Sequence, residues 1–407
     1  MFDPRKVKLD FPVLKREVNG KPLVYLDSGA TSQKPESVLN AERDYYQQHN
    51  ANVHRGAHTL GDEATQIYQD SRDRVAKFIG TRSEEIIFVR NTTEAINLVS
   101  YAWGMDNLKE GDVIVTTLME HHADLVPWQQ VAKRTGARVE VVGLTEDGLI
   151  DMDDYEKKLK MKPKMVSFVH VSNALGTINP VKEMTKLAHK AGAMVLVDGA
   201  QVVPHMKVDV SEIGCDFYAF SGHKMLGPMG IGVLWGRKEI LEKMSPFLTG
   251  GGMISEVYTD HSTWAEVPDK FEAGTPNVAG AAGLAAAIDY LEKLVMENVR
   301  AHDLEIVRYA LNELCKVRNL AILGPKDAEL RSGSVSFEYQ GVHAHDVATI
   351  LDSEGVAVRS GHHCTMPLHR HLGVAASIRA SFNVYTTKED IDALVKALAK
   401  VKEVFGK

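Results

Sequence analysis

Hydrophobic residues along the chain alternate between short β-branched runs and segments with helical spacing. In residues 62–79, for example, Ile67, Val75 and Phe78 recur on one helical face, and Gly80 is positioned to end that helix. Apolar strands that alternate with helices predict a mostly parallel sheet covered on both faces. The predicted strands of this part are 84–90, 112–118, 138–142, 165–170 and 194–198.

The pattern changes after about residue 280. A small-residue helix is predicted at 280–296, and a long amphipathic helix follows at 297–314. The C-terminal helix is predicted to begin at Thr387, with Asp390 as the second half of a capping box. Strands at 333–339, 356–360 and 377–382 complete an α+β pattern. We therefore assign 17–290 to a large domain, and 1–16 with 291–407 to a smaller α+β domain.

Composition excludes several classes of protein. The 407 residues carry a net charge of −7, which argues against a nucleic-acid surface, and no apolar run approaches the roughly 18 residues of a membrane helix. The first residues lack the apolar core of a secretory signal. Three cysteines are too few for a disulfide framework, which predicts a cytoplasmic protein.

Lys224 stands between two apolar runs, 217–220 and 231–235. A buried lysine is costly unless its amine has a partner or a chemical use. In open α/β sheets, ligands bind at the carboxyl ends of the strands. The residues just beyond the predicted strands offer hydroxyls, an imidazole, amides, a carboxylate and this amine. They are Thr92, Thr93, His121, Asn173, Asp198, Gln201, Ser221, His223 and Lys224.

This set is what an enzyme with pyridoxal 5′-phosphate requires: a lysine that forms an imine with the cofactor, an acidic partner for the ring nitrogen, and a phosphate cradle. The segments "VDGAQ", "SGHKMLGPMGIGVLWG", "FEAGTPN" and "RSGHHCTMPLH" resemble the group II, SufS-type cysteine desulfurases, members of the class V aminotransferase superfamily. The similarity runs from "FPVLKREVNGKPLVYLDSGATSQKP" to "IRASFNVY". It implies the type I fold of pyridoxal-phosphate-dependent transferases, an α/β large domain with a smaller α+β C-terminal domain.

The resemblance also implies an activity and a role for each residue. L-cysteine would give L-alanine and a persulfide on Cys364, for delivery to iron–sulfur cluster assembly. Lys224 would carry the cofactor and shuttle protons, and His121 would stack on the ring. Arg379, assisted by Arg359 at the mouth, would bind the substrate carboxylate. The implied cofactor contacts are Asp198 at the ring nitrogen, Asn173 and Gln201 at the phenolic oxygen, and Thr92, Thr93, Ser221, His223 and the partner's Thr275 at the phosphate.

The segment around Cys364 raises three further expectations. His362 and His363 are expected to favour its thiolate, whereas Cys215 and Cys315 are expected to be packing residues. The short segment implies that a dedicated sulfur acceptor must approach the persulfide. The motif "GVHAHDV" resembles desulfurases that work with a zinc-bearing acceptor of the SufU type, with His343 as a ligand to the partner's zinc.

Other functions remain open at this point. A selenocysteine lyase would share nearly every residue named, and an aminotransferase or kynureninase-like enzyme would not need Cys364. The pairs His121–His122 and His362–His363, with Cys364, are also compatible with a zinc site. A non-catalytic sulfur carrier or scaffold would show no turnover.

Overall fold

The computed structural model describes residues 2–54 and 56–406, and its centre is a sheet of seven strands. Strand β10 is antiparallel to both of its neighbours, whereas the remaining neighbours pair in parallel. This confirms the predicted mostly parallel sheet. In spatial order the strands are β4 (Ile86–Val89), β10 (Gly232–Gly236), β9 (Phe217–Ser221), β8 (Met194–Asp198), β7 (Met165–Val169), β5 (Val113–Thr117) and β6 (Arg138–Val142).

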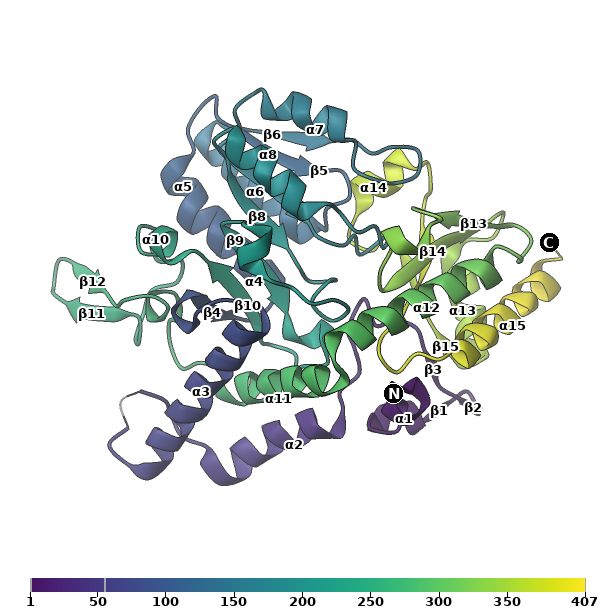
Figure 1. The fold of residues 1–407 in the computed structure, drawn as a ribbon, viewed down its shortest axis with the longest axis horizontal. Helices are drawn as coiled ribbons and strands as arrows, with labels where there is room; N and C mark the ends of the chain where they lie inside the picture. Colours follow the sequence, from purple (N-terminus) through teal and green to yellow (C-terminus); the bar gives the residue numbers. More distant parts are fainter. Residues whose placement is uncertain (1, 55, 407) are drawn as a thin grey trace.

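The sheet is covered on both faces, as its continuous apolar strands require. Alternate residues of β8 divide between two cores: Val195 and Val197 join one cluster, and Leu196 joins the other. The helices that pack around the sheet are seen in Figure 1. Among them are α2 (Glu36–Asp44), α3 (Thr59–Phe78), α4 (Thr92–Leu98), α5 (Gly104–Asn107), α6 (His122–Thr135), α7 (Met152–Leu159), α8 (Val181–Lys190), α9 (Val210–Ile213), α10 (Lys238–Leu241) and α11 (Val278–Leu294).

A second, four-stranded antiparallel sheet lies toward the C-terminus, in the order β13 (Leu320–Leu323), β14 (Ser334–Tyr339), β17 (Ser377–Ser381) and β16 (Arg359–Gly361). It encloses its own apolar core with α12 (Met296–Leu314), α13 (Ala344–Ser353) and α15 (Lys388–Phe405). The predicted capping box at the start of α15 is present, with Thr387 and Asp390 each bonded to the other's backbone. Short helix α14 (Met366–His371) follows β16.

The proposed boundary at residues 16–17 and 290–291 remains a prediction, and the N-terminal segment bears on it. After α1 (Pro4–Lys8), Phe11 joins the core of the large sheet. Leu26 belongs instead to the core of the small sheet, beside β3 (Val24–Tyr25), which pairs in parallel with β15 (Val356–Ala357). The chain therefore enters the large core before it contributes to the small one.

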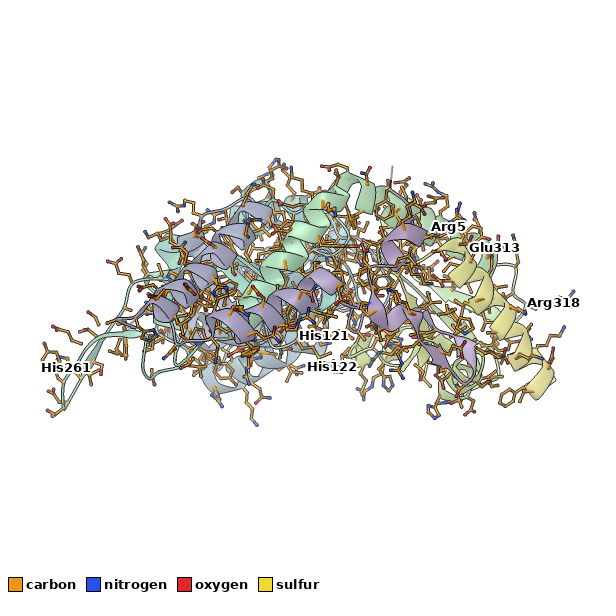
Figure 2. All side chains as sticks on the ribbon, turned by 90° about the horizontal axis from the view of Figure 1, so that it is seen from below. Arg5, His121, His122, His261, Glu313 and Arg318 are labelled. Atoms are coloured by element: carbon orange, nitrogen blue, oxygen red, sulfur yellow. The ribbon has the colours of Figure 1, made fainter. Side chains whose placement is uncertain are left out.

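A hairpin of β11 (Ile254–Val257) and β12 (Ser262–Trp264) extends away from the body of the molecule (Figure 1). His261, in the turn of this hairpin, lies at one end of the long axis of the molecule, and Arg318 lies toward the other end (Figure 2). A second short hairpin joins β1 (Glu17–Val18) and β2 (Lys21–Pro22). Within residues 2–54 and 56–406, every helix is too short or too polar to cross a membrane.

Candidate active site

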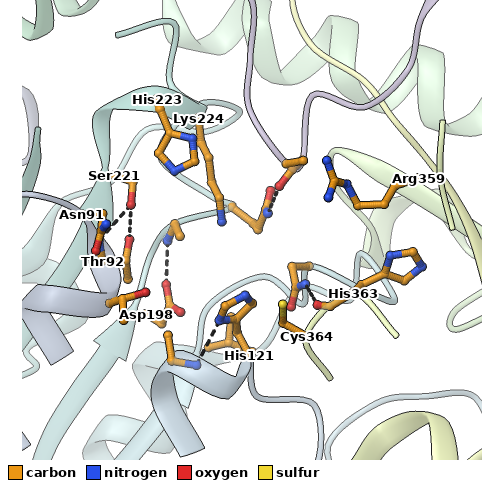
Figure 3. Close-up of a pocket in the computed structure, with 18 of the residues that line it drawn as sticks. Asn91, Thr92, His121, Asp198, Ser221, His223, Lys224, Arg359, His363 and Cys364 are labelled. Carbon is orange, nitrogen blue, oxygen red and sulfur yellow. Dashed lines mark hydrogen bonds between the residues drawn. The ribbon is translucent and has the colours of Figure 1, made fainter. Parts of the chain in front are cut away.

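A cavity of about 440 Å³ lies where the carboxyl ends of the parallel strands face the small sheet. Figure 3 shows Lys224 and Cys364 on its walls, one from each side of the cavity. Nearly all of the predicted site residues line it. They are Thr92, Thr93, His121, Asn173, Asp198, Gln201, Ser221, His223, Lys224, Arg359, Cys364 and Arg379.

Thr275 is the one predicted residue that lies elsewhere. It lines a separate cavity with Tyr68 and Glu272, beyond β4. Since the sequence assigned Thr275 to the partner's site, a place outside the cavity of its own chain is compatible with that prediction. The role of the partner's Thr275 therefore stays a prediction.

Lys224 ends the tight turn Gly222–Lys224, which directly follows β9. Burial lowers the pKa of its amine, and the nearby carboxyl of Asp198 opposes that shift. A lysine of lowered pKa holds more of its amine in the neutral, nucleophilic form. The half-buried position of Lys224 between the two apolar runs therefore changes the chemistry of this amine.

Asp198 is the last residue of β8 and is buried, with 3% of its surface exposed. Its Oδ1 accepts a hydrogen bond from Ala200 N at 2.9 Å. Burial raises the pKa of this carboxyl, and Lys224 opposes the rise. Across the described part of the chain, no lysine, arginine or histidine forms an ion pair with Asp198. A buried carboxyl in this state is suited to a cationic group brought in by a ligand.

His121 caps the N-terminus of α6, and the N–H of Ala123 donates to its Nδ1 at 3.0 Å. Burial, with smaller contributions from Lys224 and His122, lowers the pKa of His121 to about 3. A neutral ring whose Nδ1 accepts must carry its proton on Nε2. His121 therefore presents a neutral imidazole to the cavity.

Another part of the cavity wall is formed by the hydroxyls of Ser221 and Thr92, and Thr92 begins the first turn of α4. The Oγ of Ser221 accepts from Thr92 N at 2.8 Å and lies 2.6 Å from Thr92 Oγ1. Burial lowers the pKa of His223 to about 4, so this ring is neutral as well. Hydroxyls beside a helix N-terminus form an environment suited to a phosphate.

Arg379 is buried on β17, and Asn173 O accepts from its Nη1 at 2.8 Å. Burial lowers the pKa of Arg379 to about 10, and Asp27 opposes the shift. Asp27 holds both arginines, because its carboxylate lies 2.8 Å from Arg359 Nη2 and 3.5 Å from Arg379 Nη2. Sequence reasoning gave Asp27 no role. The signal was available, because Asp27 directly follows a short apolar run, as Asp198 does.

Cys364 is exposed in the turn between β16 and α14, and both Cys364 and His363 have left-handed backbones, with φ of 56° and 50°. Burial, followed by the charge of Arg379, lowers the pKa of His363 to about 2. A neutral His363 ring supplies no positive charge beside Cys364, and the expectation that His362 and His363 favour the thiolate stays a prediction. Cys215 is buried as expected, whereas Cys315 is exposed, so the packing role predicted for Cys315 is wrong.

Two further acids lie behind the cavity wall, where the sequence gave no warning of them. Asp124, on α6, accepts from Trp128 Nε1 at 3.1 Å and from the hydroxyl of Ser167. Burial raises the pKa of Asp124 to about 7, and that of Glu120 well above its usual value. The charge of Asp198 also raises the pKa of Asp124.

The zinc alternative finds no ligand set. Within residues 2–54 and 56–406, no three histidine, cysteine or acidic side chains meet as a metal site requires. Both histidines of the first pair and His363 of the second are already hydrogen-bonded, His122 through its Nε2, which accepts from Met366 N. The Nδ1 of His121 accepts from Ala123 N, and the Nε2 of His363 lies 2.9 Å from Ser377 Oγ.

Residues 24–394 match the family model described as aminotransferase class-V. A probable cysteine desulfurase from Halalkalibacterium halodurans is 56% identical over 406 residues, which covers 100% of this chain and 99% of the relative. The chain belongs to the cysteine desulfurases of the class-V aminotransferase family.

Solved structures of cysteine desulfurases share the fold. The apo enzyme from Thermococcus onnurineus superimposes with a TM-score of 0.92 at 41% identity, covering 97% of this chain and 99% of that one. The Escherichia coli cysteine desulfurase CsdA, in an S-sulfonic acid form, gives a TM-score of 0.91 at 38% identity, covering 99% of each chain. Cysteine desulfurases of this family are pyridoxal-phosphate enzymes with the two-part α/β fold described above.

Proposed function

We propose that this cysteine desulfurase transfers the sulfur of L-cysteine to Cys364 and releases L-alanine. In balanced form, L-cysteine and the Cys364 thiol give L-alanine and a Cys364 persulfide. One C–S bond breaks in the substrate and one S–S bond forms on the enzyme. The observation that carries the proposal is that Lys224 and Cys364 line the same cavity from different parts of the fold.

The residues present fit pyridoxal phosphate. Lys224 can attach the cofactor through its amine, and Asp198 supplies a buried carboxylate for the ring nitrogen. Asn173 Oδ1 is buried and, within the described residues, lacks a hydrogen-bond partner, as expected of an atom that awaits a ligand group. Thr92, Thr93, Ser221 and His223 line the same cavity, which supports their proposed role as the phosphate site.

When bound, the cofactor supplies an electron-withdrawing ring that stabilises negative charge at the substrate α-carbon. The chain supplies the proton transfers. The Lys224 amine, with its lowered pKa, can accept the α-proton and return it. A positive ring nitrogen beside Asp198 would favour the ionised carboxylate and counter the effect of burial. His121, neutral with its proton on Nε2, can donate a hydrogen bond into the cavity from that nitrogen.

Substrate orientation is assigned to Arg379, with Arg359 nearer to solvent. A guanidinium binds a carboxylate through two parallel hydrogen bonds. Arg379 Nε is buried and, in the part of the chain described, has no hydrogen-bond partner. Because Asn173 O accepts from Nη1 of this guanidinium and Asp27 lies 3.5 Å from its Nη2, these two residues orient it before substrate arrives.

The experiment quantifies alanine and sulfide from purified holoenzyme given L-cysteine and a thiol reductant. Wild type should make both products, and Cys364→Ser should form no persulfide. Cys315→Ser is the matched control, because Cys315 is also an exposed thiol but lies outside the cavity. A Cys364→Ser protein with undiminished sulfur release would contradict the assignment. The same assay with L-selenocysteine separates a desulfurase from a selenocysteine lyase by their relative rates.

We infer a homodimer that completes each site with the partner's Thr275. The projecting β11–β12 hairpin supports this, because Val257, Tyr258 and Trp264 are 64%, 51% and 41% exposed there. Large apolar side chains gathered on a projecting hairpin are typical of an interface. Sedimentation of the wild type, and of a Val257→Asp, Trp264→Asp variant, tests this. A monomeric wild type with full activity would contradict it.

A sulfur acceptor of the SufU type, with His343 as a ligand to its zinc, is the partner we propose. His343 is exposed and caps α13, and its Nδ1 accepts from His345 N at 3.2 Å, which leaves Nε2 for a metal. His343→Ala should slow sulfur transfer to such an acceptor but not alanine formation. His345→Ala is the matched control on the same turn, and equal transfer rates in the two variants would overturn the idea. Iron–sulfur assembly in the cytoplasm is the proposed destination.

A further inference from the structure

The turn that carries Cys364 holds a backbone conformation that side chains disfavour. His363 and Cys364 are consecutive, and both have left-handed φ values, of 50° and 56°. Residues other than glycine seldom adopt this region, and two in succession persist only where the surroundings hold them. The question is which contacts hold this turn.

Three consecutive carbonyls of the turn are occupied. His362 O accepts from Thr365 N and Thr365 Oγ1, both at 2.8 Å. His363 O accepts from Asn173 Nδ2 at 2.7 Å. Cys364 O accepts from the N–H of His122, also at 2.7 Å. Thr365 thus closes the turn on itself, Asn173 and His122 hold its main chain from the large-sheet side, and the side chain of His363 contacts the small sheet on the other.

The His363 ring is buried and enters a chain of hydrogen bonds. Its Nε2 lies 2.9 Å from Ser377 Oγ, and the same hydroxyl lies 2.9 Å from Nε2 of His369. Nδ1 of His369 lies 3.1 Å from the carbonyl of Thr365, one residue beyond Cys364. This series of hydrogen bonds therefore starts and ends on the turn that carries Cys364, and Ser377 of β17 is its midpoint.

Nδ1 of His369 also lies 3.3 Å from Oγ1 of Thr365, but that hydroxyl already donates to His362 O at 2.8 Å, so the contacts favour one arrangement of protons. A carbonyl only accepts, so His369 must donate from Nδ1, and Nε2 of a neutral His369 must then accept. Ser377 gives its single proton to that nitrogen, and it accepts from Nε2 of His363. His363 is left with a bare Nδ1, and this atom is buried without a hydrogen-bond partner among the described residues. Burial lowers the pKa of both rings, which favours the neutral forms that the chain requires.

We propose that Ser377 and His369 are positioning residues that lock the His363 ring and thereby hold Cys364 in its left-handed conformation, ready to receive sulfur. The proposal rests on the proposed function of Cys364, which it extends to residues outside the cavity lining. Ser377 is two residues from Arg379 on β17, so one strand places both the substrate-binding guanidinium and the anchor of the cysteine turn.

The test compares Ser377→Ala with Ser377→Thr in the holoenzyme. Losing the hydroxyl should slow persulfide formation about tenfold, the rate equivalent of one hydrogen bond, with KM for L-cysteine unchanged. The change in the cofactor spectrum on adding L-cysteine should also stay as in wild type. Ser377→Thr keeps the hydroxyl and should restore the rate. Ser334→Ala, a buried serine of the same sheet, is the matched control and should behave as wild type.

A second measurement does not depend on turnover. Iodoacetamide alkylation, followed by peptide mass spectrometry, gives the rate at Cys364 relative to the exposed Cys315 in the same molecule. Ser377→Ala should change this ratio severalfold, and Ser377→Thr should return it. His369→Leu should change the alkylation ratio in the same way. The double variant of Ser377→Ala and His369→Leu should change the ratio little more than either single variant, because both substitutions break the same series of hydrogen bonds.

Each outcome bears on one claim. A wild type that makes no alanine would remove the proposed function, while the alkylation ratio would still report on the turn. An unchanged ratio in Ser377→Ala overturns the positioning proposal, even if that variant is slow. A slow Ser377→Ala whose rate Ser377→Thr does not restore also overturns it, because the hydroxyl would then be irrelevant.

Discussion

Lys224 and Cys364 face the same cavity, but the chain reaches the two positions by different means. Asp198 ends β8, where main-chain hydrogen bonds to the parallel strand β9 fix the backbone, and Lys224 ends the turn Gly222–Lys224 that follows β9. Ser32 also holds this turn, because its N–H and its hydroxyl donate to His223 O. Cys364 stands on a left-handed turn that side chains of Asn173, His363 and Ser377 help to hold. The cofactor side is therefore built mainly by the sheet, and the cysteine side by side-chain contacts. Substitutions of surrounding side chains should matter more on the cysteine side.

The largest effect is expected at Lys224. Lys224→Ala removes the amine that moves the substrate proton, and alanine formation should fall by roughly 10³-fold or more. Quantifying alanine after L-cysteine addition measures this. Lys270→Met is the control, because Lys270 is also buried but its amine binds the carbonyls of Leu241 and Glu242, outside the cavity. Equal losses in both variants would mean that Lys224 is only structural.

The second-largest loss of activity is expected for Asp198→Asn. The amide cannot supply the negative charge that a protonated ring nitrogen needs, so we expect a loss of about 10²-fold in kcat, with weaker cofactor binding. Absorbance of the bound cofactor and steady-state rates report the two effects separately. Asp124→Asn, a buried acid just behind the cavity wall, is the matched control and should retain activity.

On the cysteine side, His122→Ala tests a smaller contact. His122 Nε2 accepts from Met366 N at 3.0 Å, and the variant loses this bond but keeps the backbone bond to Cys364. Persulfide formation should slow by up to about tenfold, with the cofactor spectrum unchanged. His371→Ala, exposed on α14, should have no effect. A changed cofactor spectrum in His122→Ala would mean that this contact of the cysteine side also affects the cofactor side.

The smallest effect concerns stability. Asp124 stays protonated in the folded state up to its raised pKa of about 7, whereas the unfolded chain ionises near 4. The folded state thus binds more protons between these values, so stability falls as pH rises from about 4 to 7. Asp124→Asn removes this loss. The difference in free energy of unfolding between the variant and wild type should therefore shift by about 1 kcal/mol or more in favour of the variant when the pH rises from 4.5 to 7.5. Chemical denaturation at both pH values measures the difference, and equal pH slopes would contradict the assignment.

The two sides also differ in how far the sequence predicted them. The apolar runs predicted where the strands end, and this identified Asp198 and Lys224 as candidate site residues. Asp27 was overlooked although its position obeys the same rule. The burial of the His363 ring against Ser377 was not predicted, because nothing in "RSGHHCTMPLH" shows it.

The sequence alone determined which side chains stand at the strand ends, since the length of each apolar run sets where a buried strand can stop. It also determined the capping box at Thr387 and the family resemblance. Only the tertiary structure decided which histidines are neutral, which carboxylate holds the two arginines, and how Cys364 is presented. Those properties depend on burial and on hydrogen bonds between segments far apart in the chain, and local patterns do not encode either.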